Sequence, residues 1–561
     1  MSLSITRPRQ IWPTLLGILL LALPVLVWLY VLQRYAVNVV MFDDYALLRF
    51  ITHWANPATS WATRLSELLA VHNTHYIIYD RLVALATYYA TGHINFLAMI
   101  VLGNAALLGI VWRLWTLFRE LNLPVWAFLP VPCWVLSLQS HENMFWAMAG
   151  LQNFTVVWFV LESLYQLHRR QSLALPLGLG VAAVLTSGNG VLAFLVGSLV
   201  LLHQRRRGAN GLIWWGITAL VMLVRLTILP VNEHKTPFMN WIPNTFLSLG
   251  SGMTNQDARL LPMLAGVGLG GLLGLALLAW LFGLGNVGKR LQQQSTTNVL
   301  MAFAVVILAT CLLLAIYRPT EDILRDRYKI YAHLALSVAY LLALSVMKRS
   351  WVRGLAAGVA AGAVAMNVAA FHASMPAVVA AHQLRQADAY NFHFYQTVVP
   401  LPYFRGPLDS LLLEAKQRDT YQFPVAFIPP TTWPTIALIS PVSIRIAPDL
   451  TVNNSMIGFH PNVVNISQPT VPRVPEGPGG RGTYVVIEAS DGKRFLMPAT
   501  PAKSGFRHFL TSGELFHPGL SAGIFAKRFT PGSYRVKVLQ VTDRTPRLYD
   551  TGQQLQIDGV N

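Results

Sequence analysis

Charged residues are scarce in this chain, and that scarcity decides which class of protein it belongs to. Asp, Glu, Lys and Arg make up 12% of the 561 residues, and hydrophobic residues make up 54%. Soluble domains carry about 25% charged residues. Half that share, together with long apolar runs, indicates a membrane protein. The net charge of +18 does not indicate a nucleic-acid partner, because the Lys and Arg residues form short clusters between apolar runs.

Cysteine and the motifs of familiar soluble enzymes are also rare or missing. The two cysteines, Cys133 and Cys311, lie inside apolar runs, where a free cysteine packs as a small hydrophobic residue. No disulfide framework is therefore expected. The sequence contains no P-loop, no GxSxG, no HExxH and no CxxC pair. A cytoplasmic nucleotide-sugar site is not supported either, since the predicted inner loops are short.

Apolar runs of about 20 residues predict the membrane spans. The first run is too long for a cleavable signal peptide, so we expect it to be retained. Eleven spans put every basic cluster on one side, which the positive-inside rule makes the cytoplasm, and the odd number puts the C-terminus outside. The predicted spans are 11–32, 94–116, 124–140, 147–167, 172–186, 190–203, 211–230, 261–284, 298–317, 329–347 and 352–371. The basic clusters are Arg7/Arg9, Arg113/Arg119, Arg169/Arg170, Arg205 to Arg207, Lys289/Arg290 and Lys348/Arg349/Arg353.

The segment between Arg170 and Arg205 is basic at both ends, so it must cross the membrane twice or not at all. Ser187-Gly188-Asn189-Gly190 in its middle is typical of a turn. We expect two short spans that meet at this turn. Non-helical backbone at such depth is tolerated only inside protein or beside a wet cavity, so the turn and Asn189 should face a cavity.

The chain changes character after residue 371. Residues 372–423 predict a helical linker, with helices near 375–396 and 408–418. Residues 424–561 alternate in short runs such as 483–488, 493–497, 533–541 and 553–557, with turn dipeptides between them. This pattern predicts a soluble, β-rich, sandwich-like domain outside the membrane. Trp433, Tyr484 and Phe506 are either its core residues or stacking surfaces for a glycan.

Two adjacent carboxylates, Asp43 and Asp44, follow the first span and precede Tyr45. Such a pair can hold a divalent cation (Mg, Mn or Ca), and a carboxylate beside a hydroxyl can act as a general base. A solvated pair, or an N-cap for the helix that begins near Tyr45, is the alternative.

The same exported loop continues with His72, His75 and Arg81, which suit a phosphate or pyrophosphate at the membrane surface. Surface histidines without a ligand are the alternative. The apolar stretch from residue 76 to 89 is too short to span and predicts a helix lying in the membrane interface.

Two later exported loops add polar residues. Glu142, Gln152 and Asn153 lie at the mouth of two spans and should face a cavity. Arg325, Arg327 and Lys329 lie on the side where basic residues are uncommon, which favours an anionic head group over topology signalling. Ion pairs with neighbouring carboxylates are the alternative.

These features resemble the GT-C superfamily of polytopic membrane glycosyltransferases, and in particular the bacterial glucosyltransferases that modify O-antigen and other surface polysaccharides. The resemblance covers about residues 1–370. It rests on Asp43-Asp44-Tyr45, the stretch HNTHYIIYDRLVALATYY from His72, the outer mouth at 142–153, the Ser-Gly-Asn-Gly turn, and Arg325-Asp326-Arg327-Tyr328.

The resemblance implies a GT-C-like body with about eleven spans in the bacterial inner membrane. It implies transfer of a sugar from a polyprenyl-phosphate donor to a cell-envelope glycan or lipid at the periplasmic face. Asp43 or Asp44 would be base or metal ligand. Donor phosphate would be held by His75, Arg81, Arg325, Arg327 and Lys329, and substrate by Tyr45, His72, Glu142, Gln152 and Asn189.

Two other functions stay open. An O-antigen-ligase- or polymerase-like enzyme would use a polyprenyl-pyrophosphate glycan and would not need the carboxylate pair. A transporter or flippase of lipid-linked sugars would carry charged residues at mid-membrane, where Arg225 is the main exception to charges at span ends.

Overall fold

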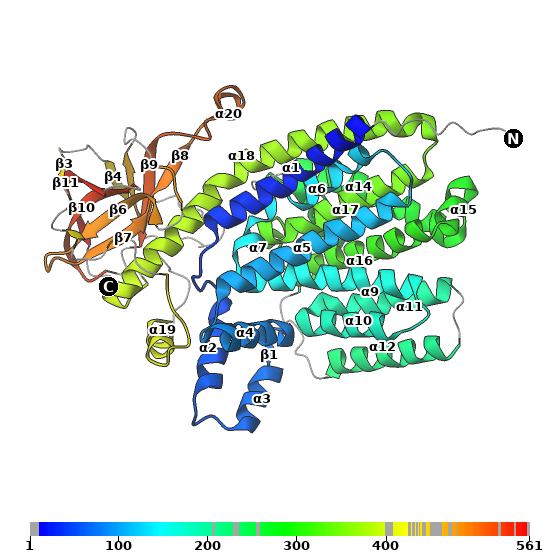
Figure 1. Cartoon of the computed structure of the whole chain (residues 1–561), viewed down its shortest axis with the longest axis horizontal. Coiled ribbons are helices and arrows are strands. Elements are labelled where there is room, and N and C mark those ends of the chain that lie inside the picture. Colours follow the sequence, from blue (N-terminus) through cyan, green and yellow to red (C-terminus); the bar gives the residue numbers. More distant parts are fainter. Residues whose placement is uncertain are drawn as a thin grey trace. The chain divides into compact units, whose positions relative to one another are not determined.

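The structure is a computed structural model of the whole chain, and most of the described chain is helical (Figure 1). It describes residues 11–561 except 205–207, 228–234, 254–257, 399–407, 425–427, 429–431, 434–435, 437, 440–444, 449–462, 469–473, 478–479, 526–528, 543–545 and 558–561. Arg7, Arg9 and Arg205 to Arg207, used above to orient the chain, lie outside the described residues.

Residue contacts divide the chain into two compact units, and each unit consists of three separate segments of the sequence. The first unit holds residues 1–31, 65–82 and 100–371, and the second holds 32–64, 83–99 and 372–561. The exported loop after the first span is therefore shared between them: Asp43 and Asp44 belong to the second unit, and His72, His75 and Arg81 to the first. The division into domains at 371 and 423 stays a prediction.

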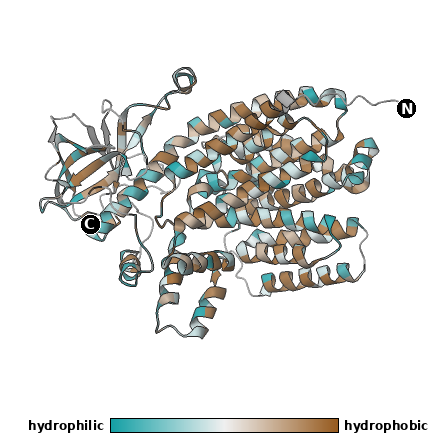
Figure 2. Cartoon of the chain, viewed as in Figure 1, coloured by the Kyte–Doolittle hydropathy of each residue, from teal (hydrophilic) through white to brown (hydrophobic). Residues whose placement is uncertain are grey.

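Within the described residues, eight helices are long and apolar enough to cross a membrane. Figure 2 shows apolar residues along most of their length. Membrane character is thus confirmed at the level of helix length and composition, whereas the count of eleven spans is not. The eight are Leu15–Tyr35 of α1 (Ile11–Tyr35), α5 (Phe96–Arg119), Ala147–Arg169, α12 (Ala209–Thr227), α14 (Leu260–Phe282), α16 (Ser295–Tyr317), Asp326–Val346 and α18 (Arg349–Tyr395).

The helix expected over 124–140 does not form as one element. Prolines at 124, 130 and 132 each lack the backbone donor that a helix interior needs, so the segment breaks into short pieces. Every residue from 127 to 151 is buried, which is the setting in which irregular backbone is tolerated. The pieces are η1 (Val125–Phe128), α6 (Pro130–Val135), η2 (Leu138–Ser140), α7 (His141–Phe145) and α8 (Ala147–Gly150).

The segment between Arg170 and Arg205 forms two short apolar helices that meet at a turn, as expected. They are α10 (Ala174–Thr186) and α11 (Leu192–His203), joined by the 3-10 turn η4 (Gly188–Val191). The turn packs tightly, because a Cβ on Gly190 would lie 2.1 Å from the carbonyl oxygen of Ala183. Only glycine fits there.

The remaining helices are shorter or connect the spans. They are α2 (Asp44–Ala55), α3 (Trp61–Leu69), α4 (Ile78–Thr91), η3 (Leu151–Thr155), α9 (Val156–Arg169), η5 (Phe238–Asn240), α13 (Trp241–Gly250), η6 (Ser251–Met253), α15 (Gly285–Gln293), η7 (Thr320–Asp322), η8 (Asp326–Tyr328), α17 (Lys329–Val346), α19 (Leu408–Gln417) and α20 (Phe506–Ser512).

The C-terminal region contains strands, as predicted, in two sheets of five and four. The first has the order β3-β11-β10-β6-β7 and the second β4-β5-β9-β8. One buried cluster takes Ile487 and Val536 from the first sheet and Ile524 from the second. The strands are β3 (Leu438–Ile439), β4 (Arg445–Pro448), β5 (Val463–Gln468), β6 (Gly482–Glu488), β7 (Arg494–Pro498), β8 (Thr500–Lys503), β9 (Phe516–Phe525), β10 (Gly532–Val541) and β11 (Arg547–Ile557).

The predicted linker does not begin at a break between two helices. No break separates residues 371 and 375, because α18 continues as one helix of 47 residues. Pro376 lies inside it. The second linker helix, α19, lies where the sequence predicts it.

Candidate functional site

A small hairpin in the first unit holds the two predicted histidines. Strands β1 (Val71–His72) and β2 (His75–Tyr76) pair antiparallel, with His72 directly opposite His75. Asn73 makes the turn with φ +53°, a conformation that asparagine tolerates better than most residues. The HNTHY sequence thus folds as a local turn that brings both imidazoles together.

Two arginines far apart in the sequence act on His75. Burial, followed by the electrostatic effects of His72 and Arg318, lowers the pKa of His75 to about 4, and Arg225 adds to the lowering. His75 is therefore neutral near pH 7. Its Nε2 is buried without a hydrogen-bond partner, so a neutral imidazole has one nitrogen left for a ligand. This differs from the cationic role that the sequence suggested for His75.

Neither Arg318 nor Arg225 forms an ion pair with any residue that the structure describes. Arg318 is exposed and follows α16 directly, while its guanidinium lies 6.0 Å from the ring centre of Tyr328. We call His75, Arg318 and Arg225, with the neighbouring Gln152, the cation cluster.

Gln152 comes from an unusual helical segment. Residues Leu151–Thr155 form a π-helix, η3, between α8 and α9. Such segments are rare and are frequent at functional sites. Gln152 forms a side-chain hydrogen bond with His75. The turn η4 is also nearby, since a Cβ on Gly188 would lie 3.5 Å from the Cβ of His75.

Asn153 and Asn189 hold neighbouring elements together. Asn153 Nδ2 donates to Asn143 Oδ1 at 3.0 Å, and Asn143 Nδ2 donates to the carbonyl oxygen of Arg327 at 2.7 Å. Asn189 Nδ2 donates to the hydroxyl of Tyr331 at 3.1 Å. These amides therefore link η3 to α7 and α7 to η8, and separately η4 to α17.

Glu142 lies in α7, and its carboxyl is buried with Oε2 lacking a hydrogen-bond partner. Burial and then the negative charge of Asp326 raise the pKa of Glu142, while Arg327, His141 and Arg325 oppose the rise. Arg327 lies 5.9 Å from the ring centre of Trp146, and its Nε is buried without a partner. Glu142 and Arg327 thus form a second group of interacting charged residues in the first unit.

Three of the five predicted phosphate-binding residues already have strong partners. Arg325 pairs with Asp322 at 2.7 Å, and Lys329, only 2% exposed, pairs with Asp326 at 2.6 Å. Arg81 donates to the carbonyl oxygens of Leu68 and Ala70. Their assignment to a phosphate stays a prediction, but their contacts favour structural roles.

The carboxylate pair in the second unit follows a strained residue. Phe42 has φ +48°, which is costly for a bulky side chain and is often found at functional sites. Asp43 occupies the N-cap position of α2, yet its side chain makes no capping hydrogen bond. The capping role considered for this position is therefore not what its side chain does.

Asp44 differs from Asp43 in its surroundings. Asp44 is 1% exposed, and it interacts electrostatically with Arg385 of α18, which is 4% exposed. Asp388, one turn further along α18, interacts with the same guanidinium. Arg385 Nη2 also lies 3.1 Å from Met41 Sδ. Asp43 is only half-buried, so it is the carboxylate of the pair that a substrate can reach.

Tyr421 stabilises the chain just before the pair. Its hydroxyl donates to the Asn38 carbonyl oxygen at 3.0 Å and accepts from the Val40 amide at 3.1 Å. Burial raises the pKa of Tyr421 well above its ordinary value, and Tyr45, Asp44 and Asp388 raise it further. The phenol therefore stays protonated and acts as a fixed donor.

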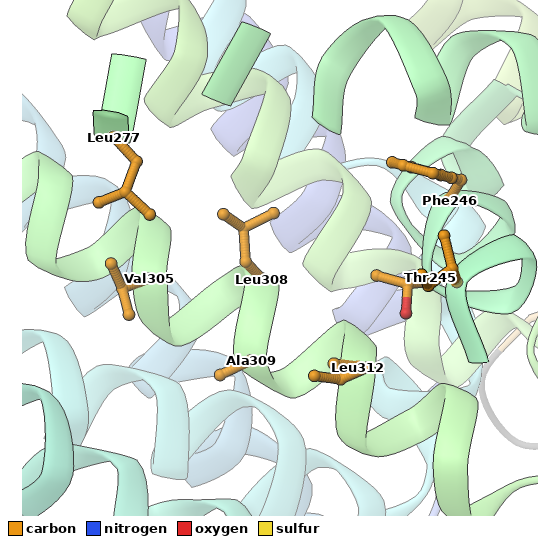
Figure 3. A pocket seen from close by; sticks show the side chains of 8 residues that line it. Thr245, Phe246, Leu277, Val305, Leu308, Ala309 and Leu312 are labelled. Carbon is orange, nitrogen blue, oxygen red and sulfur yellow. The ribbon is translucent and has the colours of Figure 1, made fainter. Parts of the chain in front are cut away.

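An apolar pocket of about 360 Å³ lies in the first unit between α13, α14 and α16. Figure 3 shows Leu308 and Leu312 of α16 and Phe246 of α13 on its wall. Leu312 is six residues before Arg318, a rise of about 9 Å along a helix. The pocket and Arg318 are thus about one and a half turns apart along α16 and its C-terminal end.

The described residues add no further metal ligands to Asp43 and Asp44. Within the described part of the chain, no group of three or more His, Cys, Asp and Glu side chains is arranged to hold a metal ion. Asp43 and Asp44 are the two candidates that the sequence offers. Because Asp44 interacts with Arg385, the pair is not two equivalent oxygen ligands.

The sequence did not single out Arg385, Asp388 or Tyr421, nor the role of Arg318 and Arg225 around His75. Each lies far along the chain from the residue it affects, and no local pattern marks it. Trp433 and Tyr484, at 4% and 0% exposed, are core residues, whereas Phe506 is 42% exposed.

Comparison of the chain with family models, curated proteins and solved structures gives no match. The functional assignment therefore depends on the residues described above.

Proposed function

We propose that this protein is a membrane glycosyltransferase that moves a sugar from a polyprenyl-phosphate donor to a cell-envelope glycan or lipid. The observation that carries the proposal is the cation cluster, in which two arginines with no ion-pair partner among the described residues act electrostatically on a neutral histidine. Both arginines lie at or just beyond the ends of membrane-length helices. Uncompensated guanidinium groups at the end of a membrane helix suit a phosphate, which they bind through charge-assisted hydrogen bonds.

The head group would sit between Arg318 and His75. Arg318 supplies the charge, and the neutral His75 ring adds none. Arg327, whose Nε is buried without a hydrogen-bond partner, is a second candidate for the sugar or phosphate.

The apolar pocket supports a lipid-linked donor rather than a soluble one. Its lining is almost entirely apolar, and four of its lining residues belong to α16, the helix that Arg318 follows. An amphiphile with its phosphate at Arg318 could lay the first part of its chain into this pocket. A soluble nucleotide sugar would have no use for such a surface.

Asp43 would act as the general base. The acceptor hydroxyl oxygen attacks the anomeric carbon of the sugar while the carboxylate of Asp43 takes the hydroxyl proton. The bond between that carbon and the phosphate oxygen breaks, and polyprenyl phosphate leaves with the electron pair. Cations stabilise the charge that develops on the leaving phosphate.

The finer fold assignment belongs to the same proposal. We infer a GT-C-like body of about eleven spans, with a sandwich-like domain on the periplasmic side of a bacterial inner membrane. The short helices α10 and α11 and the broken segment 124–140 would complete the count.

The direct test is sugar transfer by purified protein in lipid nanodiscs, from a polyprenyl-phosphate hexose to an envelope glycan or lipid extract. Product and spent donor are identified by mass spectrometry. Asp43→Asn should reduce kcat by about 10² to 10⁴-fold, as expected for loss of a general base. Asp43→Glu serves as the matched control that keeps a carboxylate, and both variants should retain the unfolding temperature of the wild type.

Other outcomes would overturn the proposal. Full activity of Asp43→Asn would exclude Asp43 as base. Consumption of a polyprenyl-pyrophosphate glycan alone would support the ligase-like alternative. Movement of intact donor across the bilayer, with no glycosidic bond broken or formed, would support the transporter.

A further inference from the structure

Helix α20 carries an isolated apolar surface in the C-terminal region. Phe506 is 42% exposed and Leu510 is 59% exposed. Among the described residues from 372 onward, these are the only large hydrophobic side chains that are exposed. They are four residues apart, so they lie on the same face of the helix.

Local hydrogen bonds fix the segment that carries α20 between strands β8 and β9. The backbone amide of Ser504 donates to the carbonyl oxygen of Leu515 at 2.9 Å, which closes the excursion between strands β8 and β9. Gly513 ends the helix with φ +75°, a conformation that favours glycine. His508 pairs with Glu514 at 3.0 Å on another side of the helix.

The segment that carries α20 is attached to α18 at His372, the residue that follows the predicted span 352–371. His372 Nε2 lies 2.9 Å from the carbonyl oxygen of Ser504, and its ring centre lies 5.1 Å from that of Phe506 and 5.2 Å from that of Phe509. His372 directly follows the run 352–371, which has the length and hydropathy of a membrane span. The contacts of His372 therefore link α20 to the residue that follows this apolar run.

We propose that α20 inserts Phe506 and Leu510 into the lipid leaflet at the residue-371 end of the predicted span 352–371, and so fixes the β-rich region to the bilayer. The two side chains would enter the boundary between head groups and acyl chains. Lys503 and Arg507, both exposed beside them, would meet anionic head groups. This inference is independent of the proposed enzymatic activity.

Two features of the molecule favour the bilayer, rather than another protein, as the partner that covers Phe506 and Leu510. The patch is small, with two side chains, whereas stable protein interfaces bury about 800 Å² on each partner. It is also held at a membrane-span terminus, where lipid is always present.

The test uses an environment-sensitive fluorophore attached to single cysteines in the full-length protein, in a Cys133→Ala, Cys311→Ala background and in nanodiscs. Leu510→Cys and Phe506→Cys carry the label on the apolar face. Thr511→Cys, on another face of α20, and Asp491→Cys, in the exposed β6–β7 turn, are the matched controls.

Labels at 506 and 510 should show blue-shifted emission and should be quenched by lipids that carry a nitroxide near the head group. They should be quenched less by lipids with the nitroxide at the chain end. Labels at 511 and 491 should emit as in water and be quenched by iodide. Water-like emission at 510 and 506 would overturn the proposal. Blue-shifted emission that no lipid nitroxide quenches would also overturn it, because the surface would then be covered by protein.

Discussion

Asp44 and Arg318 are both charged residues in a chain that has few, yet their surroundings are opposite. Asp44 is buried and interacts with the single guanidinium of Arg385, which Asp388 shares. Arg318 is exposed, has no ion pair in the described chain and acts on a neutral histidine. Buried, compensated charge stabilises a fold, whereas exposed, uncompensated charge at a helix end is available to a ligand.

The same comparison separates Asp43 from Asp44. The two are adjacent, but only Asp43 is accessible, and the strain at Phe42 immediately precedes it. Sequence alone treats them as an equivalent pair. Their surroundings indicate that one is structural and the other can react.

The largest effect should come from removing the cation beside Asp44. Arg385→Met leaves two buried carboxyl groups without their shared guanidinium, and breaking such a pair costs about 3–5 kcal/mol. We expect a corresponding loss in the free energy of unfolding, measured in detergent by chemical denaturation. Arg385→Lys, which keeps the charge, should lose less, and a triple variant with Asp44→Asn and Asp388→Asn should recover part of the loss. Unchanged stability of Arg385→Met would contradict the structural role.

A smaller effect, on binding, is expected at Arg318. Arg318→Gln removes one charge-assisted hydrogen bond, worth about 1.5–3 kcal/mol, which is about 10- to 150-fold in Kd. The measurement is the Kd for polyprenyl phosphate in nanodiscs. Arg325→Gln is the matched control, because Arg325 is already paired with Asp322 and should change Kd little. Equal losses in both variants would mean that net charge, and not the cation cluster, holds the lipid.

His75 should contribute a pH dependence of known sign. Its pKa is lowered to about 4 in the folded protein, so the unfolded chain binds more protons between about pH 4 and its ordinary 6.5. His75 therefore makes the protein less stable as pH falls through that window. His75→Gln should remove this part of the pH dependence, and lipid affinity should show no His75 titration between pH 6.5 and 8. A step near pH 6.5 that His75→Gln abolishes would contradict the burial of the ring.

The smallest effect is expected at Glu142. Its raised pKa means that the folded protein prefers the neutral acid, so stability falls as pH rises above the ordinary value of 4.5. Glu142→Gln mimics the neutral form and should leave stability near pH 4.5 almost unchanged while reducing the fall at higher pH. Asp44→Asn, the same chemical change in the compensated cluster, should destabilise instead. If both variants changed stability in the same way, the carboxyl groups of Glu142 and Asp44 would not differ in how their charge is compensated, which would contradict the account.

Sequence patterns predicted the parts of the fold that depend on local signals. Runs of about 20 apolar residues marked the eight long helices, and short alternation marked β6, β7, β10 and β11. The two short helices around Gly188 followed from charge at both ends of the segment. The error at 124–140 arose because hydropathy counts proline-containing runs as apolar, while proline prevents the helix.

The site could be predicted only in part. Sequence singled out Asp43, Asp44, His75 and Glu142 as candidates because carboxylates and imidazoles are unusual beside membrane spans. The contact of Arg385 with Asp44, and the effect of Arg318 on His75, depend on long-range packing that leaves no trace in local spacing. For the same reason, sequence could not tell which basic residues were already paired, as Arg325 and Lys329 are.

The most direct test of the account is a cryo-EM map of the protein in nanodiscs with bound polyprenyl phosphate. The account predicts density for the phosphate within hydrogen-bonding distance of the Arg318 guanidinium and the His75 ring, with the lipid chain entering the apolar pocket beside Leu312. A phosphate bound instead to Arg325 and Lys329, with the cation cluster unchanged, would contradict it.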